Sequence, residues 1–503
     1  MKRLVLIALM ALTFAAATVG SMPAAHAGIF GGKASASPSP SPSPSALPTA
    51  SPEPADVAIP RLQAKLKTNP NDQQSMVELA GQFLGINRPD LALQLSQHLL
   101  QMGDKTSQVY YIDGYSWQQA GRLQNAIVDF EQAENLDPSN IGILEALSTL
   151  YLRTNRAADA ERIGKRAVSL NKDQAQAYSI LGAVYASEGK FDDARSQFEH
   201  AATLNAKDTS PLYQIATTYG QQNNIPMAVQ TVDRVLAIDP KNVQALVFKA
   251  DLYAKQHDDR KAPAAYDDAV VAATTDDQRV AIMVRKATYF VEEKKPNDAQ
   301  GVFDQAVAQF PKIAAAHVAY GDFWASQKNL PKAQQEWQAG LALDKNNGEA
   351  LLRMAQVSMS NNRMTDAVGY LKTLTQITPD AQGFAMLGQA YSFLHDYRSA
   401  KDACGKSFQI DRQPATLGCV AGADFELKNY KEASQIFDAL DRGVHGYLEQ
   451  NPQLLYVAAK SYEQTNQKPK ALSAYKRLLA EMRKGTSEYA KIQRSIASLS
   501  KKP

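Results

Sequence analysis

Residues 175–208 decide the fold, and they read AQAYSILGAVYASEGKFDDARSQFEHAATLNAKD. Gly182 is followed three residues later by Tyr185, and Ala194 is followed four residues later by Phe198. Spacings of three and four place side chains on one face of an α-helix, whereas the side chains on one face of a strand are two residues apart. Turn-forming residues separate the two groups. This stretch therefore predicts two consecutive helices.

The same pattern recurs along most of the chain. Repeats that start at residues 73, 107, 141, 175, 209, 243, 280, 314, 348, 381, 414 and 452 are spaced by 33 to 38 residues. Position 20 is Ala in all twelve, position 8 is Ala, Gly or Ser, and position 11 is aromatic in ten. Small side chains allow two antiparallel helices to approach closely. We therefore expect twelve helical hairpins across residues 73–485.

The pattern resembles the tetratricopeptide repeat family, as Leu181-Gly182, Tyr185, Ala194, Phe198 and Ala201 show. The resemblance implies an all-α fold, a right-handed α-solenoid of antiparallel helix pairs in which each repeat contacts mainly its neighbours. Residues 56–72 and 486–503 are expected to form the N-terminal and C-terminal capping helices.

Three positions depart from the repeat pattern. Ser358 and Asp424 replace the aromatic residue at position 11, and Gly164 has no side chain to fill position 24. We expect these repeats to be looser. The longer spacings near residues 274–279 and 442–450 are expected to be loops.

The N-terminus has the layout of an export signal. Lys2 and Arg3 precede an apolar run, and Ala25-His26-Ala27 follows it, so residues 1–27 are interpreted as a signal peptide cleaved before Gly28. The alternative is an uncleaved apolar membrane anchor. Residues 28–55 are rich in Pro and Ser and are expected to form a disordered, semi-rigid linker.

Composition excludes several function classes. The chain has 54 Lys+Arg and 51 Asp+Glu, and this near-neutral balance argues against binding to nucleic acid or to an anionic membrane through bulk charge. Only 2 Cys and 7 scattered His are present, so no metal site is expected. Because no catalytic motif is found and the repeats account for nearly every ordered residue, no enzyme activity, cofactor or small-molecule substrate is expected.

The resemblance also implies a binding groove. In similar proteins the first helix of each repeat lines the concave surface, at positions 2, 5, 9 and 12. The residues at those positions that we select as binding candidates are Tyr111, Tyr115, Gln118, Tyr213, Thr217, Val247, Asp251, Gln356 and Tyr456. The alternative for each tyrosine is packing against a neighbouring helix. The Lys/Asn/Arg clamp that holds an acidic C-terminus in some family members is missing, which argues against a chaperone-tail adaptor.

Cys404 and Cys419 lie on either side of the turn predicted at Asp411-Arg412. On two antiparallel helices they would come to similar heights, and in an oxidising compartment they would form a disulfide. The alternative is two buried free thiols.

These observations together predict an exported scaffold, periplasmic or secreted, that binds peptide or helical segments of partner proteins in cell-envelope assembly or secretion. The alternative is a membrane-anchored envelope adaptor that keeps its N-terminal apolar segment. The membrane is expected to be a partner only through that segment.

Overall fold

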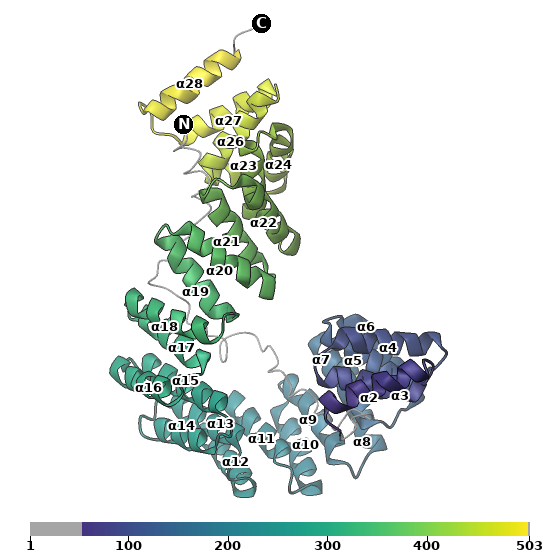
Figure 1. Cartoon of the computed structure of the whole chain (residues 1–503). Coiled ribbons are helices and arrows are strands. Elements are labelled where there is room, and N and C mark those ends of the chain that lie inside the picture. Colours follow the sequence, from purple (N-terminus) through teal and green to yellow (C-terminus); the bar gives the residue numbers. More distant parts are fainter. Residues whose placement is uncertain (1–52, 501–503) are drawn as a thin grey trace. The chain divides into compact units, whose positions relative to one another are not determined.

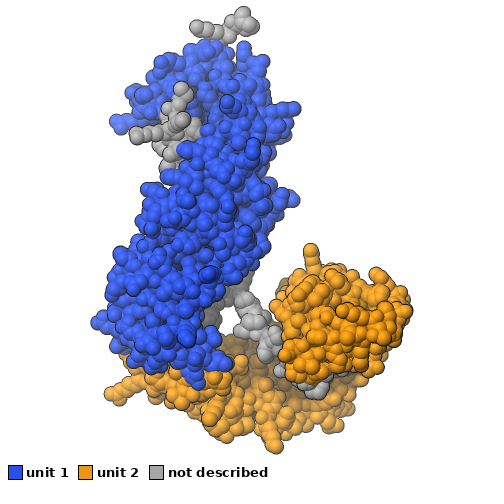
Figure 2. Space-filling model, viewed as in Figure 1, with its two compact units in different colours: residues 1–27, 275–503 blue, residues 28–274 orange. Residues whose placement is uncertain are grey.

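The computed structural model describes residues 53–500, and every regular element in that range is an α-helix (Figure 1). The expected signal peptide, residues 1–27, lies outside the described residues, as does the linker up to residue 52. The protein is an all-α solenoid of antiparallel helix pairs, as predicted. Figure 2 colours its two compact units, and the boundary between them in the sequence falls between residues 274 and 275.

The N-terminal unit, described from residue 53 to residue 274, contains one single helix followed by six helix pairs. Its helices are α2 (Ala55–Thr68), α3 (Gln73–Gly85), α4 (Pro89–Gln101), α5 (Ser107–Gln119), α6 (Leu123–Leu136), α7 (Ile141–Arg153), α8 (Ala157–Leu170), α9 (Ala175–Ser187), α10 (Phe191–Leu204), α11 (Ser210–Gln221), α12 (Ile225–Ile238), α13 (Val243–Lys255) and α14 (Lys261–Ala272).

The C-terminal unit, described from residue 275 to residue 500, contains six more pairs, one short extra helix and a final single helix. Its helices are α15 (Asp276–Glu292), α16 (Pro296–Gln309), α17 (Ala314–Ser326), α18 (Leu330–Leu343), α19 (Gly348–Ser360), α20 (Met364–Ile377), α21 (Ala381–Phe393), α22 (Tyr397–Ile410), α23 (Pro414–Glu426), α24 (Tyr430–Gly443), α25 (Tyr447–Gln450), α26 (Pro452–Gln464), α27 (Lys468–Glu481) and α28 (Ser487–Ser500).

The recurrent alanine at position 20 lies where the helices of a pair cross. All twelve of these side chains are 0% exposed: Ala92, Ala126, Ala160, Ala194, Ala228, Ala262, Ala299, Ala333, Ala367, Ala400, Ala433 and Ala471. A larger side chain at such a crossing would push the backbones apart or force its neighbours out of their preferred rotamers. The small residues that recur in the sequence therefore mark the positions where the two helices of each pair approach most closely.

The turn inside each pair has one common backbone conformation. Position 15 is left-handed in every repeat, with φ of +75° at Gly121 and +60° at Asn155, as the Gly and Asn residues there predict. Lys328 and Lys428 adopt φ of +61° and +65° at the same position, although lysine does not favour this region. Packing of the two helices therefore sets this turn even where local preference opposes it.

The two long spacings are not open loops, and that expectation was wrong. Asp276 and Asp277 form the first turn of α15, whose N-cap Thr275 accepts a hydrogen bond from the Gln278 amide at 3.2 Å. Acidic residues in a first turn also interact favourably with the helix dipole. In the second spacing, residues 447–450 form α25, and Leu448 is buried there. Capping and burial therefore order both insertions.

Single helices lie at both ends of the described range. In α2, Ala58 and Leu62 are fully buried against the first pair, and in α28 Ile492 is buried against the last. Within residues 53–500, no helix is long and apolar enough to cross a membrane.

Candidate binding surfaces

Two residues expected to line the groove are in the core instead. Tyr111 and Tyr115, on α5, are only 3% and 7% exposed. The Tyr111 ring centroid lies 5.4 Å from that of Phe130 and 6.3 Å from that of Tyr115, and burial raises the pKa of the Tyr111 hydroxyl. The assignment of these two rings to a contact surface was therefore wrong, because they fill space between helices. Gln118, one turn further along α5, is half-buried.

Tyr213, Thr217, Val247 and Asp251 are half-buried on α11 and α13, the first helices of two consecutive repeats. The Tyr213 ring centroid lies 5.5 Å from that of Phe248, which follows Val247 and joins the two helices. Thr217 donates to the Tyr213 carbonyl at 2.9 Å, and Asp251 accepts from the Tyr266 hydroxyl at 2.7 Å. The structure therefore brings these four candidates to neighbouring helices and leaves part of each side chain accessible.

The remaining two candidates lie in the C-terminal unit. Gln356 is half-buried on α19. Tyr456, on α26, is half-buried as well, and the ammonium of Lys491 on α28 lies 5.8 Å from its ring centroid. The final helix therefore reaches the surface around Tyr456, so this ring offers less area than its repeat position predicts.

The position that lacks an aromatic residue in repeat eleven is not loose. Asp424 is 1% exposed and accepts hydrogen bonds from Lys401 at 2.7 Å and from Asn429 at 2.9 Å. A buried charge with two strong partners replaces the missing ring, which corrects the expectation of a looser repeat. Ser358, the other exception, is 2% exposed.

Cys404 on α22 and Cys419 on α23 are joined by a disulfide in the structure, with their Cα atoms 6.1 Å apart. Both residues are buried. Gly388, on α21, leaves the space that the Cys404 sulfur occupies, because a Cβ added to this glycine would overlap the sulfur. The bond links repeats ten and eleven.

A tyrosine–carboxylate tie connects consecutive repeats in both units. The Tyr151 hydroxyl donates to Glu131 of the preceding second helix at 2.7 Å, and the Arg156 guanidinium lies 4.3 Å from the ring centroid of Tyr151. Tyr462 donates to Asp438 in the same way at 2.8 Å. Each tie satisfies a hydroxyl that would otherwise be buried without a partner.

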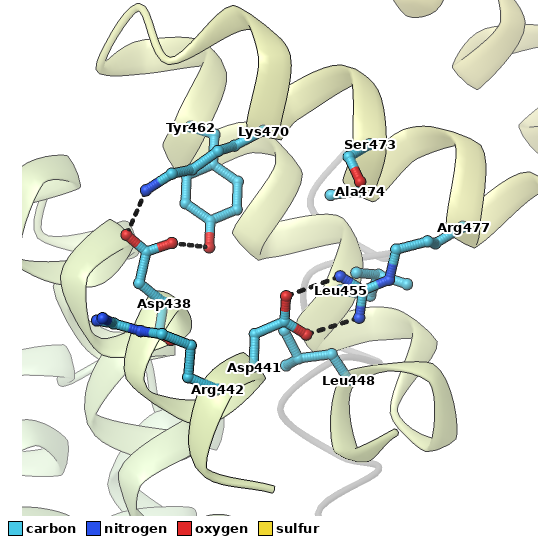
Figure 3. A pocket seen from close by; sticks show the side chains of 10 residues that line it. All are labelled: Asp438, Asp441, Arg442, Leu448, Leu455, Tyr462, Lys470, Ser473, Ala474 and Arg477. Carbon is cyan, nitrogen blue, oxygen red and sulfur yellow. Dashed lines mark hydrogen bonds and ion pairs between the residues drawn. The ribbon is translucent and has the colours of Figure 1, made fainter. Parts of the chain in front are cut away.

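Beside the second tie lies a cavity of about 350 Å³, which we call the outer pocket (Figure 3). It is lined by the second helices α24 and α27, by Leu448 of α25, and by Leu455 and Tyr462 of the first helix α26. The residues that line it are Asp438, Asp441, Arg442, Leu448, Leu455, Tyr462, Lys470, Ser473, Ala474 and Arg477. Sequence reasoning did not find this pocket; the only signal was the longer spacing that contains α25.

Two ion pairs stand on opposite sides of the outer pocket in Figure 3. On one side the Lys470 ammonium donates to Asp438 at 2.5 Å. On the other, the Arg477 guanidinium donates to both oxygens of Asp441, at 2.8 and 2.7 Å, and its Nε donates to Glu449 at 2.6 Å. The hydrogen bonds from Arg477 lower the pKa of the Asp441 carboxyl. Both carboxylates therefore already have cationic partners.

Arg442 is different. Its Nε donates to the Asp438 backbone carbonyl at 3.1 Å, but within residues 53–500 no carboxylate lies at ion-pair distance from its guanidinium. Leu448 and Leu455, which are 1% exposed, and Ala474, which is 3% exposed, supply an apolar floor. The pocket thus combines an apolar base with one unpaired positive charge at its rim.

In residues 53–500, no group of three or more His, Cys, Asp or Glu side chains is placed to hold a metal ion. The fold places the protein in the class of α-helical repeat proteins.

Comparison with known proteins identifies the repeats. Residues 284–342 match the tetratricopeptide repeat family, and residues 122–245 match the Tetratricopeptide repeat protein 21 C-terminal ARM domain family. Two stretches of the array of helix pairs thus match tetratricopeptide repeat families, and this similarity supports a protein-interaction scaffold.

The curated relatives are distant. The chain is 23% identical over 282 residues to anaphase-promoting complex subunit 7 of Mus musculus, an alignment that covers 49% of each protein. It is 27% identical over 157 residues to the chloroplastic tetratricopeptide repeat domain-containing protein PYG7 of Arabidopsis thaliana, covering 30% of this chain and 52% of that protein. The chain thus spans about half the length of the curated relatives it matches.

One solved structure similar to this chain is YrrB, described as a TPR protein with an unusual peptide-binding site. The two chains are 23% identical, and the match covers 37% of this chain and 97% of the YrrB chain, with a TM-score of 0.30.

Proposed function

We propose that this protein is an exported scaffold that binds a peptide or helical segment of a partner protein on the first-helix surface of its N-terminal unit. The observation that carries the proposal is the partly accessible group Tyr213, Thr217 and Val247 on two consecutive first helices. Tyrosine buries a large rigid surface while it keeps a hydroxyl for hydrogen bonding, and it is enriched among residues that dominate interfaces.

The neighbouring side chains suit a peptide without strong net charge. The Asp251 carboxylate already accepts from Tyr266, and the Thr217 hydroxyl already donates to a backbone carbonyl. Contact would therefore rest on the apolar parts of Tyr213, Phe248 and Val247, with hydrogen bonds at the edge. An interface with such a centre and a polar rim is the common arrangement in protein complexes.

Photo-crosslinking in the native cell tests this surface. A benzoyl-phenylalanine at Val247 should capture a defined partner, and the double variant Tyr213→Ala, Thr217→Arg should abolish that capture, because it removes the ring and places charge beside the apolar contact. The matched control carries the crosslinker at Val271, which is 84% exposed on α14. Equal capture of the same partner from Val271, or unchanged capture in the double variant, would rule out this surface.

We propose export on the basis of the N-terminal sequence, and place the scaffold in cell-envelope assembly or secretion. Sequencing the N-terminus of the protein recovered from its native host should begin at Gly28. Recovery of the chain with Met1 still attached, in the membrane fraction, would favour the alternative of a membrane-anchored adaptor.

A further inference from the structure

Charge is not spread evenly along this near-neutral chain. Residues 53–274 carry 21 Lys+Arg and 27 Asp+Glu, whereas residues 275–503 carry 30 and 24. The excess of positive charge concentrates at the end of the array, where residues 452–500 contain nine Lys+Arg and three Asp+Glu. The last repeat and the final helix are therefore strongly basic, a property that the total charge conceals.

Several of these cations have no partner of opposite charge. Lys468 and Lys476, both on α27, are exposed, and within residues 53–500 neither has a carboxylate at ion-pair distance. Arg442 at the rim of the outer pocket is in the same condition. Arg442 therefore presents a positive charge at the rim of an opening with an apolar floor, and α27 carries further exposed lysines outside the residues that line it.

We propose that the outer pocket is a second docking site, distinct from the proposed surface on α11 and α13, and that it takes an apolar side chain from an acidic segment of a partner protein. The apolar side chain would contact Leu448, Leu455 and Ala474, while a neighbouring carboxylate would pair with Arg442. A volume of about 350 Å³ is at the lower end of the 300–1,000 Å³ typical of small-ligand sites, and it suits a large side chain better than an extended ligand.

The lining favours a protein over a polyanion. The floor is apolar, and a nucleic-acid backbone or a lipid headgroup has no apolar group to bury there. An acidic amphipathic helix offers both features, because it presents apolar residues on one face and carboxylates beside them.

The extra helix α25 supports this assignment. It belongs to the spacing that breaks the regular period, and its Leu448 is buried while lining the pocket. The pocket therefore depends on a local departure from the repeat.

A fluorescent peptide of Glu and Leu at helical spacing, titrated against the full chain by anisotropy, tests the proposal. We expect saturable binding that weakens at least tenfold in Ser473→Trp, which fills the pocket from an exposed rim position, and at least tenfold in Arg442→Glu. Arg412→Glu, the control, makes the same charge change on an exposed turn outside the pocket and should bind within twofold of wild type. The Tyr213→Ala, Thr217→Arg variant should also bind normally, which separates this site from the proposed groove.

No binding of the peptide to the wild-type chain would overturn the proposal. Wild-type affinity in Ser473→Trp would also overturn it, and so would an equal loss of affinity in Arg412→Glu. Either result would show that the peptide binds through the overall positive charge of the chain and not through the pocket. Tighter binding of oligo(dT) or of phosphatidylglycerol vesicles, with no dependence on Ser473→Trp, would assign the basic end to a polyanion instead. Ser473→Leu provides a smaller filling residue if the Trp variant does not fold, as judged by circular dichroism.

Discussion

Gly321 on α17 lies directly beneath the indole of Trp337 on α18, so that a Cβ at Gly321 would reach within 2.5 Å of the ring. Trp337 is fully buried, and its Nε1 donates to Asp322 at 3.0 Å. Arg353 of the next repeat donates to the same carboxylate at 3.0 Å. Gly321 thus leaves room for the Trp337 indole, and the Asp322 carboxylate that accepts from this indole also links it to Arg353 of the next repeat.

We expect Gly321→Ala to destabilise the chain by about 1–3 kcal/mol, because the added methyl overpacks a buried contact. The matched control is Gly301→Ala on α16, where a Cβ would meet nothing within 4 Å. That change should stabilise by about 0.5–1 kcal/mol, because Ala is the better helix former. Urea unfolding followed by circular dichroism, with hydrogen exchange to localise the effect, measures both. Equal effects of the two substitutions would contradict the close contact at Gly321.

A pair of carboxyl groups makes stability depend on pH in the second repeat. Asp113 is 3% exposed and accepts hydrogen bonds from Ser96 at 2.5 Å and Trp117 at 3.2 Å, at a position where the neighbouring repeats have Leu79 and Leu147. Burial, together with the adjacent charge of Asp113, raises the pKa of the Asp129 carboxyl to about 7.

A folded pKa above the unfolded value of about 3.9 means that the folded chain retains a proton which the unfolded chain loses between these values. The stability contribution of Asp129 is therefore present below pH 4, declines as the pH rises to 7, and stays lost above it. Asp129→Asn should flatten this slope and make the chain more stable than wild type at pH 8. Urea midpoints from pH 5 to pH 8 test this, with Asp173→Asn, on an exposed turn, as the control. An unchanged slope in Asp129→Asn would contradict the raised pKa of the Asp129 carboxyl.

The tyrosine–carboxylate tie between repeats gives a third test. Tyr151→Phe removes the hydroxyl that donates to Glu131 and should cost about 1 kcal/mol, the net value typical of one intramolecular hydrogen bond. The control is Tyr185→Phe, at the same repeat position, where no hydrogen bond joins the hydroxyl to the rest of residues 53–500. This change should fall within about 0.5 kcal/mol of wild type. Equal destabilisation by the two variants would show that the tie contributes nothing.

The sequence predicted the contacts inside a repeat far better than those between repeats. Ala194 and Phe198 share a helix face through spacing alone, so their burial follows from the 3.6-residue period. The exposure of Tyr111 depends instead on Phe130 and on the helices packed around α5, and spacing within one helix carries no record of that environment. The same limit applies to the outer pocket, whose Arg442, Leu448 and Arg477 come from three helices. Its only trace in the sequence was an irregular spacing, which shows that something was inserted but not what it forms.

The disulfide between Cys404 and Cys419 leads to a final prediction. The bond closes a loop of 15 residues, and in the chain-entropy account a crosslink of this length stabilises a fold by about 3 kcal/mol. No thiol should therefore react in denaturant without reductant, two should react after reduction, and reduction should lower the urea midpoint of the C-terminal unit. The Cys404→Ala, Cys419→Ala variant supplies the control, because its midpoint should not respond to reductant. Reaction of two thiols before reduction would show that the cysteines are free in solution, and the stability assigned to the crosslink would then have to come from helix packing alone.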